Sequence, residues 1–119
     1  MSLVARHLEA NGMPTVIIGS ARDIVEACAV PRFLFVDFPL GNPCGKPWDD
    51  VMQRRIVGAA IDLFESATDA ATTVASPERW GDDGWRERYL AVTPENRAQL
   101  ARQGEDLRRR RAQRERRPV

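Results

Sequence analysis

Residues 14–38, "PTVIIGSARDIVEACAVPRFLFVDF", have the pattern strand, helix, strand, which indicates the fold class. The run from Thr15 to Ile18 is apolar or β-branched, which is typical of a short buried strand in a parallel sheet. Ser20 is expected to cap a helix that Pro31 ends. Residues 32–38 are apolar almost throughout, which predicts a central strand. The segment therefore predicts an α/β domain with a short, mostly parallel sheet and flanking helices, a partial doubly wound three-layer unit with right-handed crossovers.

Two further helices are predicted around this unit. Residues 2–10 precede the helix stop signal Asn11-Gly12. Residues 47–67 predict a longer helix that begins with Pro47 in its first turn. The apolar face of the first helix would consist of Leu3, Val4, His7 and Leu8. That of the longer helix would consist of Val51, Ile56, Val57, Ala60, Ile61 and Phe64.

The second half of the chain is less regular. Residues 72–74 are compatible with a weak edge strand, and the residues after them predict a loop and short helix with Trp80, Trp85 and Tyr89 as packing anchors. Thr93-Pro94 is a signal for the start of a helix, which becomes highly charged. We therefore expect an α/β domain over residues 1–92 and a charged helix with an arginine-rich tail over residues 93–119.

Composition excludes several classes of protein. In 119 residues with 43% hydrophobic content there is no apolar run of the roughly 18 residues that a membrane span needs. The N-terminus lacks the pattern of a signal peptide, so we expect a cytoplasmic protein without a membrane partner. Residues 1–92 hold 9 Lys/Arg and 13 Asp/Glu, a charge of −4, whereas residues 93–119 hold 9 Arg and 4 Asp/Glu, a charge of +5.

The two cysteines, Cys28 and Cys44, predict free thiols and no metal site. Their separation of 16 positions matches no zinc signature, and His7 is the single histidine of the chain. Cys28 lies on the apolar side of its helix and is expected in the core. We predict neither a metal nor another cofactor.

The loop after the second strand, "PLGNPCGKP" at residues 39–47, is the main candidate site. It is either a rigid turn or the wall of a site at the carboxyl edge of the sheet, where open α/β sheets bind ligands. Lys46 would lower the pKa of the Cys44 thiol if the two were close. Gly41 and Gly45 would allow close backbone approach to a ligand, and the three prolines stiffen the loop.

Two other side chains have alternative interpretations. Asp37, at the end of the second strand, is expected to cap loop amides or, as the second choice, to form a polar contact at the sheet rim. Ser20 follows a glycine, as in many phosphate or carboxylate sites, although helix capping alone explains it.

Residues 3–53 resemble the C-terminal part of the selenoprotein B family of glycine/betaine/sarcosine/D-proline reductases. The segment "PRFLFVDFPLGNPCGKPWD" at residues 31–49 is the strongest part of the resemblance, and "GMPTVIIGS" and "DIVEACAVPR" support it in the same order. Residues 54–66 resemble the family more loosely, and the arginine tail lies outside the resemblance.

The resemblance implies a reductase that cleaves the C–N bond of a small amino-acid-like substrate. It implies Cys44 as a thiol near the substrate and Lys46 as a carboxylate or thiolate partner. The amides around Gly41, Asn42 and Gly45 would donate hydrogen bonds. In the family a Cys/Sec motif stands just ahead of the first helix, and this sequence has none there. We therefore expect a fragment, or a subunit whose redox residue lies on a partner chain or in a homo-oligomer, with a thiol protein as a candidate electron donor.

The arginine-rich tail leaves three interpretations open. A solvated end is ranked first, contact with an acidic partner second, and nucleic-acid binding third, because the body is acidic and no aromatic residue interleaves with the arginines. The rival function is accordingly a non-catalytic subunit or interaction module of a reductase complex that docks through this tail.

Overall fold

The computed structural model describes residues 1–89 and 91–115. The chain divides into two compact units, residues 1–86 and residues 87–119. The predicted division after residue 92 falls six positions beyond the observed one.

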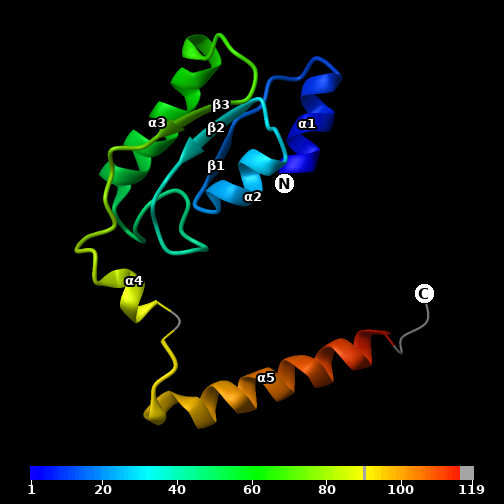
Figure 1. Ribbon diagram of the computed structural model, residues 1–119, viewed down its shortest axis with the longest axis vertical. Coiled ribbons are helices and arrows are strands. Elements are labelled where there is room, and N and C mark those ends of the chain that lie inside the picture. Colours follow the sequence, from blue (N-terminus) through cyan, green and yellow to red (C-terminus); the bar gives the residue numbers. More distant parts are fainter. Residues whose placement is uncertain (90, 116–119) are drawn as a thin grey trace. The chain divides into compact units, whose positions relative to one another are not determined.

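The first unit contains a parallel sheet of three strands (Figure 1). The strands are β1 (Ile17–Gly19), β2 (Arg32–Phe35) and β3 (Thr72–Ala75), in the order β1-β2-β3. Ile18 is paired with Leu34, and Leu34 with Val74, so β2 is the central strand and β3 an edge strand. The predicted α/β class and the central position of the second strand are confirmed.

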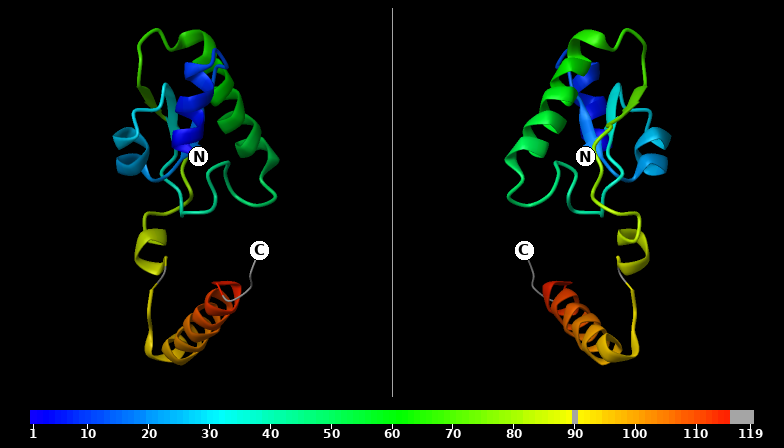
Figure 2. Two further views of the ribbon diagram at one scale, coloured as in Figure 1. Left: turned by 90° about the vertical axis from the view of Figure 1, so that its right-hand side faces the viewer. Right: turned by 90° about the vertical axis from the view of Figure 1, so that its left-hand side faces the viewer.

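Two helices cover opposite faces of this sheet, as Figure 2 shows. They are α2 (Arg22–Ala27) and α3 (Asp50–Ser66). Along β2, Phe33 packs in one cluster with Val25 of α2, whereas Leu34 packs in another with residues of α3. Successive side chains of a strand point to opposite faces, so β2 is apolar on both.

The two crossover connections have opposite hands. Both step in the same direction along the sheet, from β1 to β2 and from β2 to β3, while α2 and α3 lie on opposite faces. The expectation of right-handed crossovers throughout is therefore wrong for one of them. Because β2 carries large apolar side chains on both faces, a helix is needed on each face to exclude water.

The larger core cluster joins β2 to α3. Its members are buried hydrophobic residues: Leu34, Val36, Phe38, Met52, Ile56, Ala60 and Leu63. The smaller cluster, between β2 and α2, consists of Val25, Val30 and Phe33. Cys28 is half-buried against the smaller cluster, at the margin of the core where it was expected.

The start of α3 differs from the prediction. The helix begins at Asp50, and the Asp49 carboxylate accepts a hydrogen bond from the Met52 amide at 3.0 Å. Pro47 therefore precedes the helix and does not lie in its first turn. Trp48 adopts φ +66°, a left-handed conformation that keeps the chain out of the helix until the Asp49 cap.

The buried face of α3 is also rotated from the predicted one. Ile56 and Ala60 are buried as expected, but the other four predicted residues are exposed, namely Val51, Val57, Ile61 and Phe64. Met52 and Leu63 take their place in the core. The helix carries two apolar stripes at helical spacing, and packing against β2 selects one of them.

Helix α1 (Ser2–Ala10) ends as predicted, with Gly12 at φ +80°, but it buries a different face. Leu3, Val4 and His7 are exposed, whereas Ala5 is buried. The Thr15 hydroxyl donates to the Ala5 carbonyl at 3.3 Å, which turns this side of the helix toward the sheet.

Ser20 does not cap α2. The N-cap position is Ala21, and no side chain caps the helix there, because the helix begins one residue later than the sequence pattern predicts.

The second unit consists mainly of α5 (Pro94–Glu115), and the short α4 (Trp85–Arg88) spans the division between the units. The predicted start signal is confirmed: the Thr93 amide donates to Asn96 Oδ1 at 2.8 Å, and the Asn96 amide donates to Thr93 Oγ1 at 3.4 Å. Where burial is described in residues 87–113, no residue is buried. Within the described chain, no helix has the length and apolar character needed to cross a membrane.

Candidate functional site

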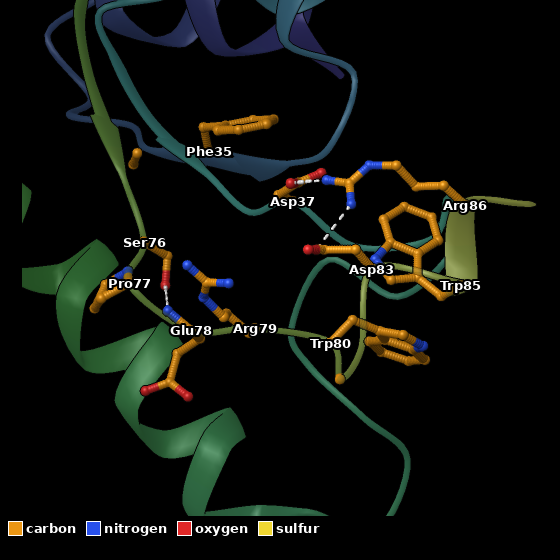
Figure 3. A pocket seen from close by; sticks show the side chains of 12 residues that line it. Phe35, Asp37, Ser76, Pro77, Glu78, Arg79, Trp80, Asp83, Trp85 and Arg86 are labelled. Carbon is orange, nitrogen blue, oxygen red and sulfur yellow. Dashed lines mark hydrogen bonds and ion pairs between the residues drawn. The ribbon is translucent and has the colours of Figure 1, made fainter.

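A cavity of about 470 Å³ lies at the carboxyl ends of β2 and β3. Its wall consists of Phe35 and Asp37 at the end of β2 and of residues 75–81, 83 and 85–86 (Figure 3). The cavity lies wholly within the first unit. It therefore occupies the edge of the sheet where parallel α/β folds bind ligands.

The segment after β3 is held in place by contacts at both of its sides. The Ser76 amide donates to the Phe35 carbonyl at 2.8 Å, which extends the pairing of β3 with β2. Arg55 of α3 holds the Glu78 carboxylate with two hydrogen bonds, of 2.6 and 3.1 Å, and these raise the pKa of Arg55. Trp80 packs on Phe38 with ring centroids 5.5 Å apart. Trp80 is thus confirmed as a packing anchor.

Arg86 connects the two walls of the cavity. Its guanidinium pairs with the Asp37 carboxylate and also contacts the Asp83 carboxylate at 3.4 Å. The same guanidinium lies 4.8 Å from the centre of the Trp85 ring, a cation–π contact. Asp37 therefore lies at the sheet rim, the second of its two predicted roles, and its carboxylate pairs with an arginine.

Within residues 1–89 and 91–115, Arg79 of the cavity wall has no ion-pair partner, and neither has Lys46, which lies outside the wall. The side chain of Arg79 points into the cavity in Figure 3. Lys46 Nζ lies 3.9 Å from the point that a Cβ atom on Gly81 would occupy, and Gly81 belongs to the wall. Lys46 thus approaches the cavity from the predicted loop.

Most of the predicted loop packs away from this cavity. The amide of Asn42 donates to the Pro39 carbonyl and the amide of Gly45 to the Asn42 carbonyl, each at 3.2 Å. Both amides are therefore engaged inside the loop. Cys44 is exposed, and neither it nor Gly41 belongs to the cavity wall. Of the six predicted site residues, Asp37 lies in the cavity wall, and Lys46 lies outside it, near Gly81 of the wall. Substrate binding by the other four residues stays a prediction.

The residues that sequence reasoning missed belong to the segment 75–86. Arg79 and Arg86 were not singled out, although both lie in the tryptophan-rich sequence "SPERWGDDGWR". The position of this segment in the sequence could have identified it as part of a site. It follows the third parallel strand, whose carboxyl end lies at the same sheet edge as that of the second.

Within the described part of the chain, no three His, Cys, Asp or Glu side chains lie close enough together to hold a metal ion. Cys28 and Cys44 are free thiols. The arrangement offers a small open cavity with aromatic walls and charged side chains.

Comparisons with known proteins supply no family for this chain. No protein-family model, no curated protein and no solved structure matches it.

Proposed function

We propose that this chain is a component of a reductase of the glycine/betaine/sarcosine/D-proline type, which binds a small amino-acid-like substrate in the cavity at the carboxyl edge of β2 and β3. The cavity carries the proposal, because it is of a size for such a substrate and lies where an open parallel sheet binds ligands. The resemblance of residues 3–53 to the family supplies the reaction type. A cytoplasmic location stays a prediction from the sequence.

The proposal assigns part of an active site to this chain. Reductive cleavage of a C–N bond takes two electrons, and the cavity wall contains no cysteine among its residues. We propose that the redox residue belongs to another segment or to a partner chain. Cys44 is exposed and free, so it is accessible to a thiol protein that delivers electrons.

The loop is tested by alkylation of Cys44 with iodoacetamide, with and without glycine, sarcosine or betaine. We expect the ligands to slow alkylation of Cys44, because Lys46 of the same loop lies near Gly81 of the cavity wall. The Cys28→Ser variant leaves Cys44 as the single thiol, and Cys44→Ser is the matched blank. A Cys44 that reacts like a free model thiol and gains no protection would remove the loop from the site.

The reductase assignment is tested separately by reading the genomic sequence upstream of Met1 in frame, through any UGA codon. We expect a Cys/Sec motif there or on a neighbouring reading frame that encodes a partner. Unrelated sequence in both places would contradict the reductase assignment.

The second candidate function is a non-catalytic subunit that docks through its arginine-rich helix. It is favoured by α5, a helix of 22 residues with exposed arginines in the part whose burial is described. An exposed helix without an apolar stripe is stabilised by charged contacts rather than by a core. A chain that ends at Leu107 should lose capture of an acidic partner that the full chain retains at low salt. Equal capture by both chains would refute docking.

A further inference from the structure

We infer that two copies of this chain associate through the outer face of α3, with the two α3 helices antiparallel about a two-fold axis. The outer face of α3 consists of Arg54, Gly58, Ile61 and Glu65. It is separate from the cavity at the carboxyl edge of β2 and β3, because none of these four residues belongs to the cavity wall. The inference therefore does not rest on the proposed reductase activity.

The four residues form one line along the helix. They stand at positions i, i+4, i+7 and i+11, which lie one above another on an α-helix. Arg54, Ile61 and Glu65 are exposed, and Gly58 is half-buried. The surface of Ile61 is 58% exposed and that of Val57, beside it, 41%. The line points away from the sheet, because the buried residues of α3 lie on the opposite side of the helix.

Contacts within the first unit involve the two flanks of α3 and leave this line uncovered. On one flank, Arg55 pairs with the segment that follows β3. On the other flank, the ring of Phe64 lies 5.7 Å from the guanidinium of Arg32. Among the residues that the structure describes, neither Arg54 nor Glu65 has an ion-pair partner. The charges of the outer face are therefore available to a second molecule.

The outer face is complementary to itself in the antiparallel orientation, which identifies the second molecule as another copy of this chain. With the two-fold axis between residues 59 and 60, Arg54 faces Glu65 of the second copy and Gly58 faces its Ile61. Two-fold symmetry makes each of these contacts occur twice. A parallel pair would instead place Arg54 against Arg54 and Glu65 against Glu65, and like charges repel.

Gly58 allows the two helices to approach closely. Glycine in a helix interior is less favourable than alanine, and a Cβ atom on Gly58 would meet no atom within 4 Å. Packing within the first unit therefore does not require a glycine at this position. Opposite Ile61 of the second copy, the missing side chain leaves a hole into which the isoleucine packs.

The contact is small, so the association should be weak. One pair of helices of 17 residues buries less surface than the roughly 1,600 Å² of a standard stable interface. The dimer should therefore form at high concentration. At the low micromolar concentrations used to follow unfolding by fluorescence, the chain should be monomeric and Ile61 exposed.

Sedimentation velocity of the full chain, from low micromolar to millimolar concentration, tests the association. We expect a reversible monomer–dimer equilibrium that Ile61→Glu abolishes. Ile24→Glu is the matched control, because Ile24 is 62% exposed on α2, which covers the opposite face of the sheet (Figure 2). This control should leave the dimer unchanged. A chain that stays monomeric throughout, or equal dimerisation of the two variants, would overturn the inference.

Exchange of charges tests the antiparallel orientation. Arg54→Glu or Glu65→Arg alone places like charges against each other twice, so each should weaken the dimer by about tenfold or more at low salt. The double variant restores both opposite-charge pairs and should recover most of the association. A double variant that associates as weakly as the single variants would contradict the antiparallel arrangement.

Gly58→Gln separates association from folding. Glutamine favours a helix more than glycine does, and the added Cβ atom meets no atom of the first unit, so the midpoint of thermal unfolding should rise at low concentration. At high concentration the dimer should weaken, because the longer side chain occupies the place of Ile61 from the second copy. Undiminished dimerisation of this variant would contradict the close contact at Gly58.

Discussion

Gly45 shows how a single residue fixes the candidate loop to the core. It adopts φ +109°, which L side chains rarely adopt. A Cβ atom built on it would lie 3.1 Å from Met52 Cγ and 3.3 Å from Ile56 Cδ1. The glycine was predicted as a point of close approach to a ligand, and the close approach in the structure is to α3.

We predict that Gly45→Ala destabilises the first unit by about 1–3 kcal/mol, because it combines backbone strain with overpacking of the core. Gly41→Ala is the control: Gly41 has φ +95°, but a Cβ atom there would meet no atom within 4 Å. The Gly41→Ala variant should lose about 1 kcal/mol of unfolding free energy, from backbone strain alone. Urea denaturation followed by tryptophan fluorescence measures both. Equal losses in the two variants would argue against the packing contribution.

Glu9 is a second residue whose environment predicts a measurable effect. Its carboxylate accepts a hydrogen bond from Arg32 at 2.6 Å and one from the Thr15 amide at 2.7 Å. The hydrogen bond from Arg32 is the main cause that lowers the pKa of Glu9. The folded state therefore binds the proton less readily than the unfolded state.

The contribution of Glu9 to stability should be present above its unfolded pKa, about 4.3, and be lost as pH falls through the lower folded pKa. We expect Glu9→Gln to lower the free energy of unfolding by about 1 kcal/mol at pH 7 and to converge with the parent chain in acid. Chemical denaturation at several pH values measures the difference in unfolding free energy between the variant and the parent chain. The titration of the other carboxyl groups affects both proteins equally and cancels in this difference. A difference that grows toward low pH would contradict the assignment.

At the scale of elements, α3 is defined by the choice between its two apolar stripes. The buried stripe holds Ile56, which is 0% exposed, and the other holds Ile61, which is 58% exposed. Both stripes have helical spacing and similar residues, so periodicity alone does not separate them. The match to the apolar face of β2 decides which one enters the core.

The two isoleucines form a matched pair on one helix. Ile56→Ala should destabilise by about 2–5 kcal/mol, because it leaves a cavity in the larger core cluster. Ile61→Ala should change stability by less than about 0.5 kcal/mol, as surface substitutions do. Thermal or urea unfolding distinguishes them. A large loss from Ile61→Ala would show that the second stripe is covered.

At the scale of the whole molecule, the first unit carries the core. All the hydrophobic residues that are described as buried lie between Ala5 and Leu63. We therefore predict that residues 1–86 fold alone, with a midpoint of urea denaturation close to that of the full chain. Circular dichroism should show the loss of helix from α5 and from the last residues of α4, which the cut after residue 86 divides. Failure of this fragment to fold would mean that residues 87–119 contribute to the stability of the first unit.

The order and type of the elements and the place of the central strand follow from local sequence patterns. In residues 32–38 the side chains that would point to either face of the sheet are mostly apolar. This pattern is typical of a strand that is covered on both faces. The end of α1 at Gly12 and the start of α5 at Thr93-Pro94 are also predictable from local sequence, because the capping groups are neighbours in sequence.

Which faces are buried and which residues form the cavity depend on tertiary packing. The buried face of α3 depends on β2, and the position of Arg79 depends on contacts made by Glu78 with α3 and by Trp80 with Phe38. These pairs are far apart in the sequence, Arg55 and Glu78 by 23 positions. Local pattern carries no information on such contacts, because they form only when the strands and helices pack together.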